Sequence, residues 1–322
     1  MKKGIIIFNI VVLVLMLVLS EMYFYKRFIK EARIMDYKNP YFITIPDILE
    51  AVSDSAYYPR RYKEPDNKND FTKKAPILLL GCSYAFGTYL TSDTNFQGQL
   101  RKLTNRWVYN FGIPGHDNAT ALMLLEEEQK HPILKRKPEY IIYVYVFHHL
   151  QRNVEKKYYN FYRKEGFIPS QKYNFLYNFY TYAHFKNRIL EDMYWNDLEF
   201  KGHQELFIKL LSKTKKITDK LYPQSKFIVL IYSDENYDHP DGTLENMGYS
   251  EFKLQKLFDI MESAEFKKKI ENLGIEVITT QELIGRKMDK PEDRVPNDAN
   301  RPHPTAKAWE EITPKFVERL KL

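Results

Sequence analysis

Residues 75–87, Ala-Pro-Ile-Leu-Leu-Leu-Gly-Cys-Ser-Tyr-Ala-Phe-Gly, decide how the rest of this sequence is interpreted. An apolar run that stops at Gly81-Cys82-Ser83 is typical of a buried parallel strand that ends in a tight turn. Ligands bind at the carboxyl ends of the strands in an open α/β sheet, so we expect an exposed Ser83 at such an edge. The pattern also fits a plain strand-to-helix turn in which Ser83 only caps the helix.

Two other glycine-containing turns do not fit the residues around Ser83. A phosphate-binding loop carries Gly-Lys followed by Ser or Thr, and no such triplet follows residue 81. The nucleophile elbow G-x-S-x-G requires a second glycine at the position that Ala85 occupies. The turn at Ser83 therefore belongs to neither of these classes.

The composition is compatible with a globular enzyme. The chain has 322 residues, of which 44% are hydrophobic, and a formal net charge of +7. Lys and Arg are interspersed with Asp and Glu and no nucleic-acid motif occurs, so we expect a basic solvated surface and no nucleic-acid partner. Cys82 is the single cysteine, which excludes an intrachain disulfide and a zinc site built from several cysteines. We expect no metal and no cofactor.

The N-terminal part of the chain is its most apolar segment. Residues 4–20 are apolar apart from Asn9, and together with residues 21–24 they are long enough to cross a bilayer as a helix. We predict a transmembrane signal anchor over residues 1–25, with a cleaved signal peptide as the alternative, although no small-x-small site follows. Basic residues at 26–33 favour a cytoplasmic domain by the positive-inside rule. A lone helix after a tiny basic head is usual for export, so we expect the domain outside, in the periplasm or at the cell surface.

Beyond the predicted anchor, residues 26–74 contain several prolines and a polar run, and we predict a stalk or strap there. From residue 75 to 322 apolar and amphipathic segments alternate, which indicates an α/β domain with a mostly parallel, doubly wound sheet. The predicted strands are 77–81, 107–111, 140–146, 227–232 and 275–280. The predicted helices are 95–103, 118–129, 205–221, 251–273 and 305–320.

An aromatic-rich interval, residues 154–200, interrupts this alternation after the third predicted strand. Three interpretations stay open: a cap with its own small core, a platform that stacks on sugar rings, and a patch that rests on a membrane. Burial in a core is the commonest fate of large aromatic side chains, so it is the leading interpretation.

Three further segments follow predicted strands or precede the last helix, where the alternation places them beside Ser83. Residues 108–116, with Gly112 and Gly115, allow a turn whose backbone N–H groups face the site. Residues 147–153 begin with Phe-His-His, and one of the two histidines is expected to be an ordinary polar residue at a strand end. Residues 298–305, Asp-Ala-Asn-Arg-Pro-His-Pro-Thr, lead into the C-terminal helix.

Taken in order, these four segments resemble the sequence blocks of the SGNH (GDSL-like) hydrolase superfamily. The resemblance implies a three-layer α/β/α sandwich with a five-stranded parallel sheet of order 2-1-3-4-5. It assigns the nucleophile to Ser83, an oxyanion-hole N–H to Gly115 and the general base to His303.

This chain departs from the blocks of the superfamily at three positions. Cys82 stands where an aspartate usually precedes the serine, and His148 stands in place of the oxyanion-hole asparagine. An imidazole N–H can also donate a hydrogen bond, so His148 is the candidate third donor. The acid usually lies three residues before the histidine, at Asn300 here, so Asp298 is the nearest candidate and a Ser-His dyad is the alternative.

The resemblance implies acyl transfer through a serine ester on an acylated substrate. Together with the predicted anchor, it leads us to expect an esterase that removes O-acyl groups from cell-envelope glycans. The alternatives are an O-acyltransferase acting on the same polymers and a catalytically inactive glycan-binding or scaffold protein. We make no prediction of the oligomeric state.

Overall fold

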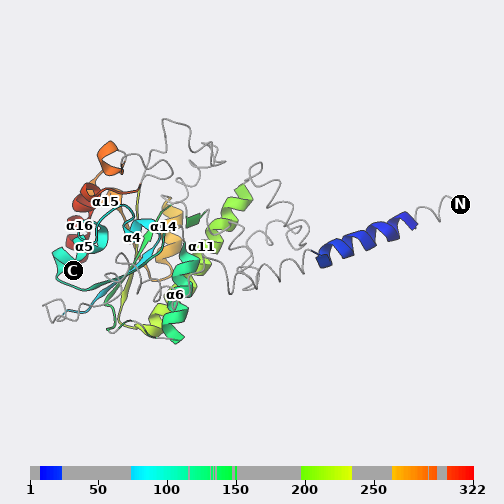
Figure 1. Ribbon diagram of the computed structural model, residues 1–322, viewed down its shortest axis with the longest axis horizontal. Helices are drawn as coiled ribbons and strands as arrows, with labels where there is room; N and C mark the ends of the chain where they lie inside the picture. Colours follow the sequence, from blue (N-terminus) through cyan, green and yellow to red (C-terminus); the bar gives the residue numbers. More distant parts are fainter. Residues whose placement is uncertain are drawn as a thin grey trace. The chain divides into compact units, whose positions relative to one another are not determined.

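The computed structural model describes residues 8–23, 74–114, 117–130, 132, 134, 136–146, 149–150, 197–233, 263–288, 290–295 and 303–322. The chain divides into two compact units, one of residues 1–44 and 154–206 and the other of residues 45–153 and 207–322. Figure 1 shows the described helices and strands, coloured along the sequence. The larger unit contains the sheet and the described candidate site residues.

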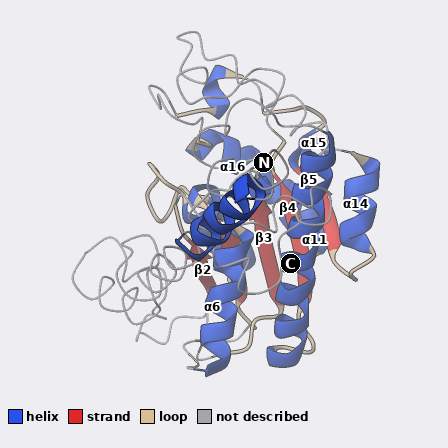
Figure 2. Ribbon diagram, turned by 90° about the vertical axis from the view of Figure 1, so that its right-hand side faces the viewer, coloured by secondary structure: helices blue, strands red, loops and turns tan. Residues whose placement is uncertain are grey.

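The larger unit is built on one parallel sheet whose strand order, β2-β1-β3-β4-β5, confirms the expected order 2-1-3-4-5 (Figure 2). The carboxyl ends of the strands lie in register, because Gly81 of β1 pairs with Gly112 of β2 and Val144 of β3. Each strand lies within a residue or two of its predicted range. The strands are β1 Ile77–Gly81, β2 Val108–Gly112, β3 Tyr140–Tyr145, β4 Lys226–Ile231 and β5 Glu276–Thr279.

Helices cover both faces of the sheet, which makes the unit a three-layer α/β/α sandwich (Figure 1). Alternate residues of β3 point to opposite faces. Ile142 and Val144 join a buried cluster that includes Trp309. On the other face Tyr145 packs on Phe207, with ring centroids 4.6 Å apart. The first face carries α4 Ser83–Phe86, α5 Phe96–Thr104, α15 Thr280–Ile284 and α16 Ala306–Leu320, and the second carries α6 Asn118–Lys130, α11 Asp197–Leu221 and α14 Ala264–Glu271.

The helix N-termini are marked by capping residues that the sequence shows. Asn95 accepts a hydrogen bond from the backbone N–H of Gly98 at the start of α5, and Thr305 accepts one from Ala308 at the start of α16. Thr279 and Glu282 form a capping box at α15, in which each side chain accepts from the backbone N–H of the other residue. These caps explain why predicted and observed starts agree closely for α5 and α16.

The structure corrects the starts of two predicted helices and adds two short helices. α11 begins at Asp197, eight residues before its predicted start and inside the interval assigned to the aromatic insertion. α14 begins at Ala264, where Ser263 caps it, and not at the predicted residue 251. Residues 251–262 lie outside the described residues. The short helices α4 and α15 were not predicted, because four or five residues carry no readable amphipathic period.

Two predicted segments cannot be compared with the structure over most of their length. The stalk at 26–74 has only Lys74 among the described residues, and the aromatic interval 154–200 has only residues 197–200. Their interpretations therefore stay predictions.

In the smaller unit, residues 8–23 form a helix with mostly exposed apolar side chains, drawn in blue in Figure 1. Over the part of the chain that the structure describes, no helix is long and apolar enough to cross a membrane. The remaining residues of the predicted anchor lie outside the described part.

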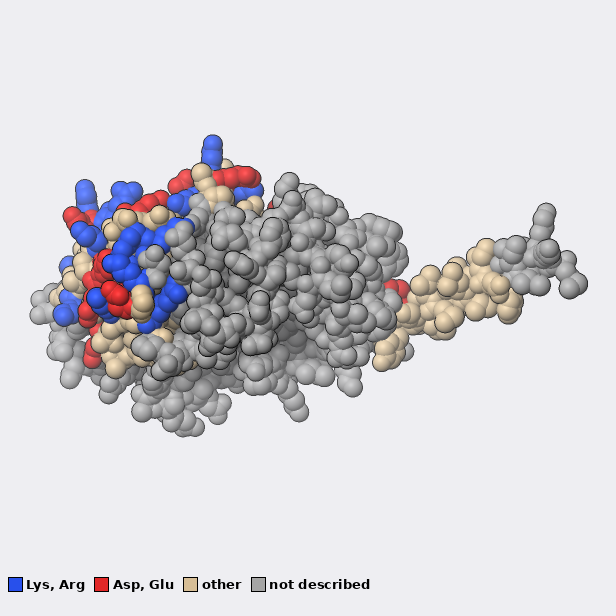
Figure 3. Space-filling view, turned by 90° about the horizontal axis from the view of Figure 1, so that it is seen from above, with Lys and Arg blue, Asp and Glu red and all other residues tan. Residues whose placement is uncertain are grey.

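The charged surface of the larger unit is mixed. Figure 3 shows Lys and Arg side chains interleaved with Asp and Glu side chains over the described atoms of that view. Several pairs lie within ion-pair distance, including Lys267 and Glu282 at 2.9 Å and Lys269 and Glu265 at 2.8 Å. This arrangement agrees with the expected solvated surface.

Candidate active site

Ser83 lies at the carboxyl end of β1, where the sequence predicts it. The strand leaves the sheet through Gly81, whose φ of +140° is strained for any residue with a side chain, and whose added Cβ would lie 2.8 Å from the carbonyl oxygen of Val144. Ser83 is then the first residue of α4, and its carbonyl oxygen accepts hydrogen bonds from the N–H groups of Gly87 and Thr88. The turn thus folds back over its own first residue.

One expectation about Ser83 is wrong. The sequence predicts an exposed serine, but only 4% of this residue is accessible. The residue is enclosed because α4 begins at Ser83 itself and the following turn returns to its carbonyl group. Its Oγ atom lies 3.9 Å from Sγ of the buried Cys82, a weak contact that agrees with Cys82 as a packing residue.

Two residues of β2 hold α4 against the sheet. The side chain of Asn110 donates to the carbonyl oxygen of Ala85 at 2.7 Å and accepts from the N–H of Gly112 at 2.9 Å. A Cβ on Gly112 would lie 2.6 Å from the backbone nitrogen of Phe86, so only glycine leaves room for α4 there. The sequence interpretation assigned Gly112 to turn flexibility and missed Asn110, whose signal is a polar side chain in the middle of a buried strand.

His303 lies beside the turn that begins at Ser83. Its ring is 5.4 Å from the ring of Tyr84, the residue directly after Ser83, and 5.3 Å from the ring of Tyr89, at the far side of the turn. Tyr84 in turn packs edge-on against Tyr232 at 5.1 Å, just after β4. The imidazole is therefore held by aromatic side chains on two sides of the turn, and only 7% of His303 is accessible.

The backbone around His303 is fixed because residues 303–305 pair with residues 293–295. The N–H of Val295 donates to the carbonyl oxygen of His303 at 2.9 Å, and the N–H of Thr305 donates to the carbonyl oxygen of Asp293 at 3.0 Å. Arg294 and Pro304 form an isolated antiparallel bridge between these two bonds. The position of His303 therefore depends on the position of residues 293–295.

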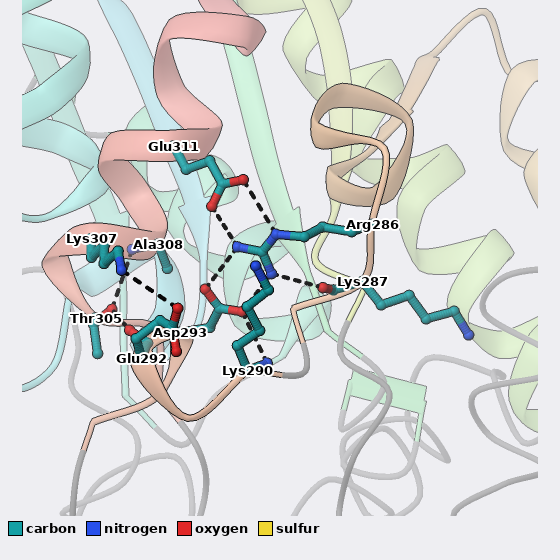
Figure 4. Close-up of polar contacts among 9 residues, drawn as sticks. All are labelled: Arg286, Lys287, Lys290, Glu292, Asp293, Thr305, Lys307, Ala308 and Glu311. Carbon is teal, nitrogen blue, oxygen red and sulfur yellow. Dashed lines mark hydrogen bonds and ion pairs between the residues drawn. The ribbon is translucent and has the colours of Figure 1, made fainter.

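A network of charges, here termed the clasp and made of Arg286, Asp293 and Glu311, anchors that segment (Figure 4). Arg286 donates to both carboxylate oxygens of Asp293, at 2.6 and 3.0 Å, and to both oxygens of Glu311 on α16. The side chain of Asp293 is 1% accessible and also accepts from the backbone N–H of Lys290 at 3.1 Å. Hydrogen bonds to Asp293 and Glu311 raise the pKa of Arg286 above its usual range, so the guanidinium stays charged.

The remaining predicted site residues lie outside the described residues: Gly115, His148, Asp298 and Asn300. Their roles stay predictions. The neighbouring His149 is fully buried, and its Nδ1 atom lies 2.6 Å from the hydroxyl of Tyr143. His149 is therefore a core residue, which agrees with the expectation that one histidine of the pair is structural. Within the described residues, no group of three His, Cys, Asp or Glu side chains is arranged to bind a metal ion.

Comparisons with known proteins concern the fold. No protein-family model matches the chain, and no curated protein matches it. Among solved structures, a member of the lipolytic protein G-D-S-L family from Veillonella parvula is 12% identical, with a TM-score of 0.39, and the match covers 77% of this chain and 99% of that one.

Two further solved structures have similar values. TesA is 14% identical with a TM-score of 0.43, and the match covers 76% of this chain and 98% of that one. The periplasmic domain of a lipopolysaccharide acetyltransferase from Salmonella ser. Paratyphi A is 10% identical with a TM-score of 0.44, over 87% of this chain and 98% of that one. Because the identities and scores are this low, the function of this chain has to follow from its own residues.

Proposed function

We propose that this chain is a serine ester hydrolase of the SGNH type, with Ser83 as nucleophile and His303 as general base. The observation that carries the proposal is the contact of the His303 ring with Tyr84 and Tyr89, which flank the turn that begins at Ser83. A serine at the carboxyl end of an inner parallel strand, with a histidine from a distant loop beside the turn that follows the strand, is an arrangement suited to acyl transfer.

The proposed reaction has two steps. His303 takes the proton of Ser83 Oγ while that oxygen attacks the ester carbonyl carbon, and the same histidine then protonates the departing alcohol. Water, deprotonated by His303, attacks the acyl-serine, releases the acid and restores Ser83.

The negative charge of the tetrahedral intermediate collects on the carbonyl oxygen. Backbone N–H groups of Ser83 and Gly115 stabilise it in this proposal, with His148 as a third donor. Loss of one such donor costs about 3 kcal/mol in the transition state. Asp298 orients the imidazole of His303 or, in the alternative, Ser83 and His303 act as a dyad.

The proposed substrates are O-acyl groups on cell-envelope glycans, and the proposed location is the outer side of a membrane in which residues 1–25 anchor the chain. The exposed apolar side chains of the helix at 8–23 support the anchor, because such a surface is unfavourable in water. An O-acyltransferase on the same polymers and an inactive glycan-binding scaffold are the alternative functions. In the acyltransferase alternative the acyl group passes from Ser83 to a sugar hydroxyl, whereas in the esterase it passes to water.

A fluorophosphonate probe tests the nucleophile directly, because it phosphonylates an activated serine and releases fluoride. We expect labelling of the purified full chain at Ser83, located by peptide mass spectrometry. Ser83→Ala should abolish it, whereas Ser233→Ala, which changes a buried serine just after β4, should leave it intact. Absence of labelling together with absence of activity on short acyl esters would leave the scaffold function in place of the enzyme.

Activity on short acyl esters tests the residues that are proposed to act together with Ser83. His303→Ala should remove nearly all activity, and adding Ser83→Ala should remove little more, since residues that act as one unit are strongly non-additive. Asp298→Asn should cost less than His303→Ala if it only orients the ring, and Asn300→Asp should raise activity by restoring an acid three residues before the histidine. His148→Ala should lower kcat more than it raises KM, because its hydrogen bond forms mainly in the transition state.

A further inference from the structure

Tyr89 combines two features that are unusual for a large aromatic residue. The residue is 62% accessible, and its backbone has a φ of 67°, in the left-handed region that residues with bulky side chains rarely adopt. The other described non-glycine residues with positive φ, Asn105 and Lys321, end α5 and α16, where such a conformation is common. Tyr89 ends no helix, because Gly87 already terminates α4.

The turn that contains Tyr89 is held on both sides of it. The N–H of Thr88 donates to the carbonyl oxygen of Ser83 at 3.0 Å, and the N–H of Leu90 donates to the carbonyl oxygen of Gly87 at 3.0 Å. The side chain of Leu90 packs against the core cluster. With its neighbours fixed in this way, Tyr89 keeps its unfavourable backbone conformation and stays largely accessible to solvent.

The ring of Tyr89 meets His303 edge-on. The two ring planes make an angle of 77° with centroids 5.3 Å apart, so neither ring is stacked face to face on the other. An exposed aromatic ring with a phenolic hydroxyl offers an apolar face and a polar edge to a ligand. Strained residues that persist beside a candidate base point to a functional role.

We propose that Tyr89 forms the binding subsite for the sugar ring of the alcohol half of the ester. The inference rests on the proposed function and follows from the role of the base. His303 must donate its proton to the oxygen of the departing alcohol, so the atoms next to the imidazole belong to the alcohol half rather than to the acyl half. Tyr84 and Tyr89 both contact the imidazole, but only Tyr89 of the two is accessible, so its ring is the one that can reach that half.

The test compares two acetate esters with the same acyl group, ethyl acetate and an O-acetylated methyl pyranoside. Tyr89→Asn removes the ring and places a residue that tolerates positive φ, so the turn is retained. We expect kcat/KM for the pyranoside ester to fall by roughly twofold to tenfold relative to kcat/KM for ethyl acetate, the range expected for loss of one aromatic contact. The rate with ethyl acetate measures any displacement of His303 that follows loss of the Tyr89 ring, because ethyl acetate has no sugar ring to bind. Tyr89→Phe, which keeps the ring, should resemble the unaltered chain.

Fluorophosphonate labelling separates this inference from the proposed function, because the probe releases fluoride and needs no alcohol subsite. Labelling of Ser83 in Tyr89→Asn should slow no more than the reaction with ethyl acetate does, because both report only the placement of His303. If Ser83 is labelled but both esters slow equally, or neither slows, Tyr89 is not a sugar subsite and the esterase still stands. If Ser83 is not labelled in the unaltered chain, the proposed function itself fails.

Discussion

Asp293→Asn tests whether the clasp positions the candidate base. The substitution keeps the shape of the side chain and removes its charge, so Arg286 loses its bidentate partner, which lies at 2.6 and 3.0 Å. Breaking a buried ion pair costs about 3 to 5 kcal/mol. Here Arg286 is 22% accessible and retains Glu311, so we expect a loss of about 2 to 3 kcal/mol in the free energy of unfolding.

The assay is denaturation in urea, followed at equilibrium on the purified full chain. Glu311→Gln is the matched control within the clasp, because the side chain of Glu311 is 40% accessible and an exposed pair contributes about 0 to 1 kcal/mol. Arg286→Lys keeps the charge and loses the planar fork, so its cost should fall between those of the other two variants.

The functional part of the prediction concerns His303. Because residues 293–295 pair with residues 303–305, a loosened clasp should displace the imidazole and slow fluorophosphonate labelling of Ser83 at temperatures where the chain is still folded. The double variant Asp293→Asn, Glu311→Gln should be labelled more slowly than Asp293→Asn alone. Equal losses of stability for Asp293→Asn and Glu311→Gln, or an unchanged labelling rate in a destabilised Asp293→Asn chain, would refute the reasoning.

Three other predictions use separate parts of the molecule. Gly112→Ala should lower the free energy of unfolding by about 1 to 3 kcal/mol, because the new Cβ would lie 2.6 Å from the backbone nitrogen of Phe86; an unchanged urea midpoint would contradict this. Burial alone would raise the pKa of Glu282, but hydrogen bonds from Lys267 and the N–H of Thr279 outweigh it and lower the pKa. The pKa of Glu282 is thus lower in the folded chain than in the unfolded chain. Its contribution to the free energy of unfolding is therefore present above the usual glutamate range and is lost as the pH falls through the folded pKa. The difference in free energy of unfolding between the unaltered chain and Glu282→Gln should accordingly disappear in acid. Carbonate extraction should leave the chain in the membrane pellet, and recovery in the soluble fraction would contradict the anchor at residues 1–25.

The residue pattern by itself predicted the strands of the larger unit and a mostly parallel sheet, and the strand order followed from the resemblance to the SGNH superfamily. Buried parallel strands are continuous apolar runs, and amphipathic segments between them can only be crossover helices, so strands such as Ile77–Gly81 were placed correctly. Helix starts were accurate where a capping side chain marks them, as at Asn95 and Thr305. Ser83 at the end of β1 follows from the same local signals, because the glycine before it and the end of the apolar run are adjacent in the sequence.

Only the tertiary structure decided how the candidate site is held together. The burial of Ser83, the clearance at Gly112 and the packing of Tyr89 on His303 all depend on contacts between segments far apart in the chain. Local patterns report the backbone preferences and the buried face of one segment, but they carry no information about which distant side chain lies against it. Arg286 and Asp293 illustrate the reason, since in the sequence they are two ordinary charges. The burial of the Asp293 side chain against Arg286, in the segment that pairs with residues 303–305, is a property of the folded chain alone.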